Sequence, residues 1–170
     1  MSYSVVMTSY KLEVIADSEA PTILTRRKLR AARALVFDAF TQPEYIVRWM
    51  GPASSQWVAC ESDLRVGGSY RWVQRTPAGE EFAFAGEFKE VVRPDRLVRT
   101  FVFEPMPEHV AVETLIFEEH EGITTVTATT VHNTMEGRDG HLAAKVDDGM
   151  AESYERLETL LSSLTAGAAR

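Results

Sequence analysis

The sequence predicts an α+β fold in which a curved antiparallel sheet of about seven strands wraps around one long C-terminal helix. Two observations lead to this prediction. Between Gly51 and His132 the chain is a series of short strand-like segments separated by turn signals. From Asp139 to Leu164 the apolar residues instead recur every three or four positions, which gives a helix one apolar stripe. The strands need a cover for their apolar face, and we take this helix to be that cover.

The predicted helix over 139–164 would be roughly 37 Å long at about 1.5 Å per residue. Its apolar stripe consists of Leu142, Val146, Met150, Tyr154, Leu157, Leu160, Leu161 and Leu164. We expect Asp139 to cap the helix N-terminus and Met150, near the middle of the stripe, to face the sheet. Gly149 lowers helix stability relative to alanine, so its place beside Met150 suggests close packing or space for a guest molecule.

Residues 1–20 are expected to form an N-terminal extension or an edge strand, and a single domain covers 21–165. Pro21 to Arg30 reads as the first long strand. Helical spacing follows in 31–40 and again in 44–49. Thr41-Gln42-Pro43 separates these two short helices, because the residue before a proline disfavours helix.

Six strands are then expected in a meander, with a turn between each strand and the next. They span 57–64, 69–75, 82–92, 97–104, 110–119 and 123–131. Gly86 in the middle of a strand suggests a bulge or a close approach where the sheet bends. A long meander curls because its strands twist, and a straight helix cannot contact all of a curled sheet. We therefore expect a cavity between the helix and the sheet, closed at one end by the two short helices.

The composition of the chain excludes several classes of protein. With 45% hydrophobic and 25% charged residues it is an ordinary globular domain, and its net charge of -7 argues against nucleic acid as a partner. It has no apolar run long enough to span a membrane and no signal-peptide pattern at the N-terminus, so we expect a cytoplasmic protein. The lone Cys60 fits a reducing compartment, and its strand-like surroundings favour a small buried hydrophobe over a reactive thiol.

Four stretches of the chain resemble the signatures of one family. They are Val36-Phe-Asp-Ala-Phe-Thr-Gln-Pro-Glu44 followed by Trp49-Met-Gly-Pro52, then 63–70, 90–97 and 149–157. The chain is similar in these stretches to bacterial activator-of-Hsp90-ATPase-homologue proteins of the START/Bet v 1-like (SRPBCC) superfamily. The resemblance implies a helix-grip fold, a hydrophobic ligand pocket between the sheet and the C-terminal helix, and a role in the stress response. Met50 and Met150 stand where relatives often have Trp, which would loosen the pocket.

We expect this pocket to bind a small apolar or amphipathic molecule without any cofactor. The predicted lining residues are Trp49, Met50, Trp57, Tyr70, Trp72, Phe84, Phe88, Phe101, His109, Glu113, Val146, Met150 and Tyr154. For each aromatic residue the alternative is plain core packing. Two other functions stay open: a chaperone ATPase co-regulator, as the family name implies, and an enzyme resembling a polyketide cyclase or hydrolase.

His109 and Glu113 are four residues apart, so on an extended strand they would share a face. They are candidates for an acid–base pair or a polar anchor at the pocket mouth, and the alternative is a surface pair. Since no other pair suits catalysis, we expect a binding protein rather than an enzyme. The spacing of the histidines and Cys60 does not suit zinc, so we expect no metal.

Arginines and strand edges give two further expectations. Arg71, Arg75, Arg96 and Arg99 lie on the predicted strands. An inward arginine would need a partner and could hold a ligand carboxylate, although outward arginines are more common. An N-terminal arm and an exposed edge strand predict a homodimer.

Overall fold

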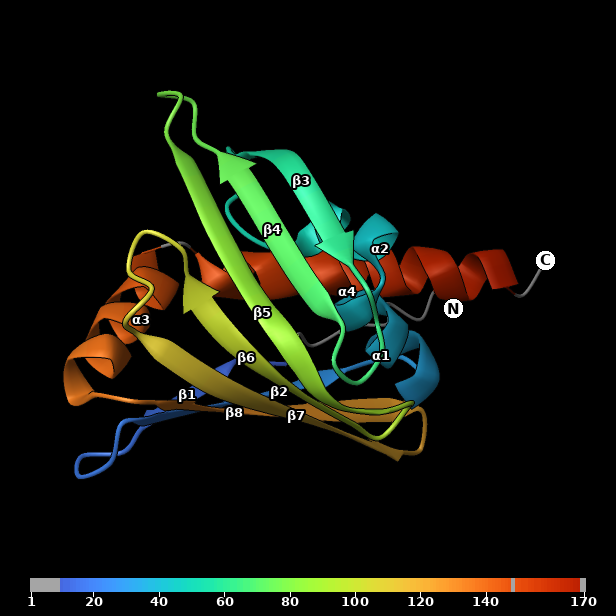
Figure 1. The fold of residues 1–170 in the computed structure, drawn as a ribbon. Coiled ribbons are helices and arrows are strands. Elements are labelled where there is room, and N and C mark those ends of the chain that lie inside the picture. The colour runs from blue at the N-terminus through green and yellow to red at the C-terminus, as the bar shows by residue number, and fades with distance from the viewer. Residues whose placement is uncertain (1–9, 148, 169–170) are drawn as a thin grey trace.

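The structure is a computed structural model that describes residues 10–147 and 149–168. Within these residues the chain forms eight strands and four helices (Figure 1). In chain order they are β1 (Glu13–Ala16), β2 (Thr22–Leu29), α1 (Arg33–Thr41), α2 (Pro43–Trp49), β3 (Gln56–Ser62), β4 (Ser69–Arg75), β5 (Glu81–Val92), β6 (Arg96–Phe103), β7 (Val110–His120), β8 (Ile123–His132), α3 (Met135–Asp147) and α4 (Met150–Ala168).

All of these strands belong to one antiparallel sheet with the order β1-β2-β8-β7-β6-β5-β4-β3. From β3 to β8, neighbours in the sheet are also neighbours in the chain, as the predicted meander requires. Figure 1 shows the sheet curling around α4, with α1 and α2 towards one end and α3 at the other. The predicted fold class is therefore confirmed. The strand beyond the expected seven is the short β1, which forms the edge of the sheet beside β2.

The sheet bends where its strands are irregular or lack a side chain. The pairing register shifts between Trp57 and Ala59 and again between Phe88 and Glu90. At Gly86, a Cβ atom would overlap the carbonyl oxygen of Thr100 and lie 2.6 Å from Cε1 of Tyr70. The close approach predicted for Gly86 is confirmed, since only glycine leaves room for the tyrosine ring at this point.

The prediction of a single helix over 139–164 is wrong, because α3 ends at Asp147 and α4 begins at Met150. Gly149 has a φ of 65°, in the left-handed region that glycine adopts readily and that a continuing α-helix does not allow. A Cβ at Gly149 would meet only the Glu152 side chain, at 3.4 Å. This glycine therefore supplies a backbone conformation rather than the close packing or guest space expected of it.

The expected N-cap at Asp139 is also wrong, because Asp139 lies inside α3. The cap is instead made by Thr134, whose hydroxyl accepts a hydrogen bond from the backbone N–H of Gly137 at 3.0 Å.

The hydrophobic core lies between the concave face of the sheet and α4. The helix contributes Tyr154, Leu157, Leu160 and Leu161, all buried. Beneath it α1 and the sheet join through aromatic rings, with the centroids of Phe37 and Phe117 5.2 Å apart. This core confirms the C-terminal part of the predicted apolar stripe.

Candidate functional site

A charged pair lies inside the sheet at the centre of its concave face. Arg99 on β6 is only 4% exposed, and it stands directly opposite Glu113 on β7 in the strand register. Its Nε donates to Oε1 of Glu113 at 2.8 Å, and Nη2 lies 2.6 Å from the same oxygen. Burial lowers the pKa of the Arg99 guanidinium, but Glu113, Tyr70 and Tyr154 together outweigh burial, so the pKa is raised. Arg99 is therefore charged inside the fold.

Aromatic side chains enclose this pair from the neighbouring strands and from α4. The guanidinium carbon of Arg99 lies 4.8 Å from the ring centroid of Trp72 and 5.2 Å from that of Tyr70. Tyr70 donates its hydroxyl to the carbonyl oxygen of Thr100 at 2.6 Å. Burial raises the pKa of Tyr70 and of Tyr154, so both hydroxyls keep their protons at neutral pH. We refer to Tyr70, Trp72, Arg99, Glu113 and Tyr154 as the Arg99 cluster.

Among the buried polar atoms that have no hydrogen-bond partner in the described part of the chain, two lie next to Arg99 and Glu113. One is Nε1 of Trp72, within the Arg99 cluster, and the other is the hydroxyl of Thr130 on β8. Thr130 lies directly opposite Glu113 in the register. Leaving such a group unpaired in the interior costs about 1–3 kcal/mol. The inner face therefore presents an indole donor and a hydroxyl beside the ion pair.

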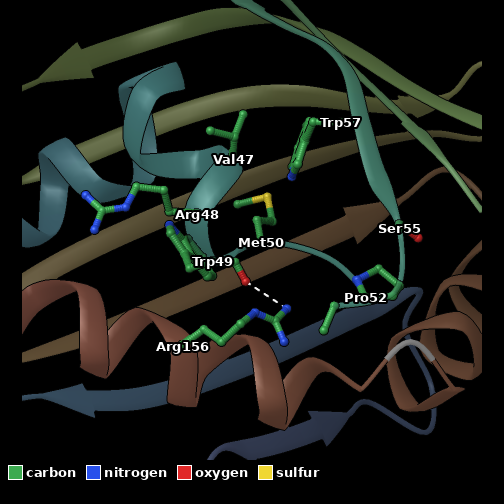
Figure 2. Close-up of a pocket in the computed structure, with 9 residues that line it drawn as sticks. Val47, Arg48, Trp49, Met50, Pro52, Ser55, Trp57 and Arg156 are labelled. Atoms are coloured by element: carbon green, nitrogen blue, oxygen red, sulfur yellow. Dashed lines mark hydrogen bonds between the residues drawn. The ribbon is translucent and has the colours of Figure 1, made fainter.

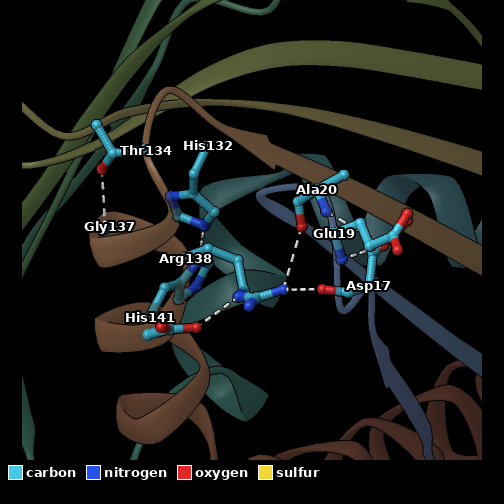
Figure 3. A network of polar contacts seen from close by, with 9 residues as sticks. Asp17, Glu19, Ala20, His132, Thr134, Gly137, Arg138 and His141 are labelled. Atoms are coloured by element: carbon cyan, nitrogen blue, oxygen red, sulfur yellow. Dashed lines mark hydrogen bonds and ion pairs between the residues drawn. The ribbon is translucent and has the colours of Figure 1, made fainter.

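At the other end of the concave face, helix α3 is fastened to the sheet by polar contacts (Figure 3). Nε2 of His132 and Nδ1 of His141 are 2.8 Å apart, and the His141 ring stacks on Phe101 with centroids 5.2 Å apart. Arg138 donates to the carbonyl oxygens of Asp17 and Ala20 in the turn between β1 and β2. The ring of Phe101 in turn stacks on Phe84, and both phenylalanines remain partly exposed.

Two adjoining hollows lie beside α2, where it meets β3 and α4. Figure 2 shows the first of them. The first has a volume of about 170 Å³, and the second, along α4, about 290 Å³. Lining residues of the first include Val47, Arg48, Trp49, Met50, Trp57 and Arg156. Arg48 and Arg156 also line the second hollow, so they stand at the boundary between the two.

Comparison with known proteins identifies the family. The model of the family described as "Activator of Hsp90 ATPase homolog 1-like protein" matches residues 30–162. The chain belongs to this family. The family membership predicted from the four sequence stretches is thereby confirmed, and we call this family AHSA1-like.

Solved structures of related proteins share the AHSA1-like fold. A protein from Rhodobacter sphaeroides has a TM-score of 0.81 at 22% identity, with 90% of this chain and 99% of that chain covered. A Nitrosomonas europaea protein has a TM-score of 0.76 at 29% identity, with 89% and 99% covered. For a Staphylococcus epidermidis protein the TM-score is 0.73 at 26% identity, with 86% and 93% covered. No protein with a curated function is similar enough in sequence to count as a match.

In this AHSA1-like chain the predicted pocket residues are spread over several places. The Arg99 cluster contains Tyr70, Trp72, Glu113 and Tyr154, and Phe88 packs against the Tyr70 ring at 5.3 Å. Phe84 and Phe101 lie at the α3 end. The first hollow beside α2 is lined by Trp49, Met50 and Trp57. Met150 packs against the core from the first turn of α4, and the side chain of Val146 lies outside the described side chains.

His109 and Glu113 are not seen as a pair. β7 begins only at Val110, so His109 belongs to the preceding turn, where its Nε2 lies 3.6 Å from Oε1 of Glu108. The carboxylate of Glu113 is hydrogen-bonded to Arg99 instead. Acid–base chemistry by these two residues stays a prediction from the sequence that this geometry does not support.

Sequence reasoning singled out neither Arg99 nor Thr130. The signal for Arg99 was present, because Leu97 and Phe101 mark the inward face of β6 and Arg99 lies midway between them. For the other three arginines named from the sequence, the outward orientation is seen: Arg71, Arg75 and Arg96 are exposed and pair with glutamates. Nothing in the local sequence pointed to Arg48 and Arg156, which only the packing of α2 on α4 brings together.

Neither a cluster of metal-binding side chains nor a membrane-spanning helix is present in the described part of the chain. Among these residues no three His, Cys, Asp or Glu side chains gather closely enough to hold a metal ion. No helix in the same residues is long and apolar enough to cross a membrane.

Proposed function

We propose that this AHSA1-like protein binds a small, neutral, amphipathic molecule between the concave face of the sheet and α4, with its polar end at the Arg99 cluster. The observation that carries the proposal is the unpartnered Nε1 of Trp72 next to a buried ion pair. A core that served packing alone would gain stability by pairing or removing such a donor. A ligand oxygen that accepts from the indole would satisfy it.

The charge at the Arg99 cluster favours an uncharged polar group on the ligand. Glu113 already neutralises Arg99 through two contacts to one carboxylate oxygen. A ligand carboxylate would have to lie close to Glu113, and two like charges repel strongly away from water. A ketone, ester or alcohol oxygen can accept from Trp72 without this cost. The inward arginine thus supports a ligand different from the carboxylate that the sequence suggested.

The surroundings of the Arg99 cluster suit the apolar part of such a ligand. Phe84 and Phe101 extend the aromatic surface from Trp72 towards α3, and both keep some exposed area. This supports ligand entry from the α3 end of the space between the sheet and α4, opposite α1 and α2. Apolar walls with a few fixed polar groups are typical of small-molecule sites.

The contacts within the cluster support binding rather than catalysis. A general base takes a proton from the ligand, and protonating Glu113 would remove its ion pair with Arg99 and leave that cation buried without its partner. Burial raises the pKa of the two tyrosine hydroxyls, so they stay protonated at neutral pH and neither can act as a general base. Chaperone co-regulation, homodimerisation and a cytoplasmic location remain predictions from the sequence.

The proposal is tested with N-phenyl-1-naphthylamine as a neutral fluorescent probe and 2-nonanone as its competitor. The probe should bind, and 2-nonanone should displace it more effectively than nonanoate does. Trp72→Phe keeps an aromatic ring but loses the donor, so 2-nonanone should bind it about fivefold more weakly, which corresponds to about 1 kcal/mol for one hydrogen bond.

Trp57→Phe is the matched control, because Trp57 lies beside α2 and away from the Arg99 cluster. It should leave the affinity for 2-nonanone unchanged. Equal affinity of 2-nonanone for the parent and Trp72→Phe, or failure of 2-nonanone to displace the probe, would contradict the proposal.

A further inference from the structure

Two arginines without a carboxylate partner in the described part of the chain line both hollows beside α2. In the described part of the chain, neither Arg48 nor Arg156 has an Asp or Glu oxygen within ion-pair distance. This is unusual in a chain with a net charge of -7, where most other described arginines have an acidic partner. The residues that line the two hollows include no Asp or Glu either.

The guanidinium of Arg156 is held in place from one side only. Its Nη2 donates to the carbonyl oxygen of Trp49 at 3.0 Å, to that of Gly51, and to the hydroxyl of Ser153 at 3.2 Å. These bonds tie α4 to the end of α2 and orient the planar group. Within the described residues its Nε and Nη1 groups make no hydrogen bond, so donors remain available to a ligand. Arg156 is thus a preorganised cation rather than a mobile surface side chain.

The other wall of the first hollow is apolar. Figure 2 shows Val47, Met50 and Trp57 on one side and Arg156 on the other, while the Arg48 side chain extends outwards from α2. Val47 is 38% exposed although it lies beside Met50 and Trp57. The volume of about 170 Å³ is similar to that of an apolar cavity of about 150 Å³ that accepts one benzene ring. The hollow therefore has room for one ring or a short acyl chain.

We infer that these hollows form a second binding site, for small aromatic or short-chain carboxylates. The ring lies against Met50 and Trp57 in the first hollow. The carboxylate lies at the boundary of the two hollows, which Arg156 and Arg48 both line. A planar guanidinium with free N–H groups suits a carboxylate, and two cations without counterions favour an anion. The charge preference is opposite to that of the Arg99 cluster, and this inference does not depend on the proposed function.

The test uses 3-phenylpropanoate and its neutral amide, 3-phenylpropanamide, followed by the indole N–H signals in ¹H–¹⁵N spectra. The carboxylate should shift the Trp57 signal and leave the Trp72 signal in place. The carboxylate should also bind about tenfold more tightly than the amide, because two arginines face the charge. Its affinity should fall as sodium chloride is raised, since the site is open to solvent.

Variants separate a role in binding from a role in folding. Arg48→Gln removes a side chain that makes no hydrogen bond or ion pair within the described residues, so it should keep the fold and weaken 3-phenylpropanoate binding several-fold. Arg75→Gln, which removes an exposed arginine paired with Glu81 on another part of the sheet, should not change this binding. Arg156→Lys keeps the charge but not the planar guanidinium, and should also weaken 3-phenylpropanoate binding.

Three outcomes would overturn the inference. They are equal binding of the acid and the amide, unchanged affinity in Arg48→Gln, and a shift of the Trp72 signal in place of the Trp57 signal.

Discussion

Arg99 keeps its charge inside the sheet because Glu113 lies directly opposite it and the rings of Trp72 and Tyr70 cover its guanidinium. Taking both ions out of water is costly, and their attraction offsets that cost only while both are present. The pair therefore contributes less to stability than its short distance suggests, whereas the loss of one partner is expensive. Retaining such a pair in a core is easier to understand if it organises a polar site.

Glu113→Leu should lower the free energy of unfolding by about 3–5 kcal/mol, because it leaves the Arg99 cation buried without its partner. In the double variant Arg99→Met, Glu113→Leu most of that loss should be recovered, since two apolar side chains of similar volume replace the ions. Urea unfolding measures both variants. Glu104→Gln, which breaks the exposed Arg71–Glu104 pair, is the control and should change stability by only about 0–1 kcal/mol. A double variant as unstable as Glu113→Leu alone would contradict this explanation.

At single positions the sequence predicted residue environments better than residue partners. Strand alternation correctly indicates the buried position of Tyr70 and Trp72 on β4. The partner of Glu113 depends on which residue of β6 lies opposite it, and the register between two strands cannot be read from either strand alone. For that reason the sequence favours His109, which is near in sequence, as the partner of Glu113, whereas the partner in the structure is Arg99.

Among the elements, the break between α3 and α4 changes how the C-terminal segment covers the sheet. Helix α3 lies at one end of the sheet, where its His141 contacts His132 of β8. Only α4 lies along the concave face of the sheet. The sequence could not reveal the break by periodicity, because apolar residues continue at helical spacing on both sides of Gly149. The low helix propensity of Gly149 is the available signal for the break, but it is equally consistent with close packing or space for a guest molecule.

Gly149→Ala distinguishes a helix that continues through residue 149 from a break at Gly149, because the two predict opposite signs for the change in stability. In a continuous helix the change would stabilise the protein by about 1 kcal/mol. At a φ of 65° an alanine is strained, so we expect it to destabilise the protein by about 1–2 kcal/mol instead. The control is Gly140→Ala within α3, where the Cβ meets no atom within 4 Å and should stabilise by about 0.5–1 kcal/mol. Urea unfolding of both variants gives the two signs, and stabilisation by Gly149→Ala would contradict the break.

In the whole molecule, a meander of twisted strands wraps one helix so that charged and aromatic side chains from distant strands meet at its centre. Turn signals and hydrophobic periodicity were sufficient to predict this architecture. They could not divide the predicted pocket residues between the Arg99 cluster and the hollows beside α2, because that division depends on how tightly the sheet curls and where α2 docks on α4. The two proposed sites differ in charge, and we propose a neutral ligand for the inner one and an anion for the one beside α2.

Binding at the Arg99 cluster is tested most directly by the three indole N–H resonances during a titration with 2-nonanone. Trp49 is an internal reference, since its Nε1 already donates to the carbonyl oxygen of Ala39 at 2.9 Å. Single Trp→Phe variants assign the resonances. We expect the Trp72 resonance to move to lower field as its N–H gains an acceptor, while the Trp49 resonance stays in place. A Trp72 resonance that does not move at any ketone concentration, or moves no further than that of Trp49, would contradict ligand binding at this cluster.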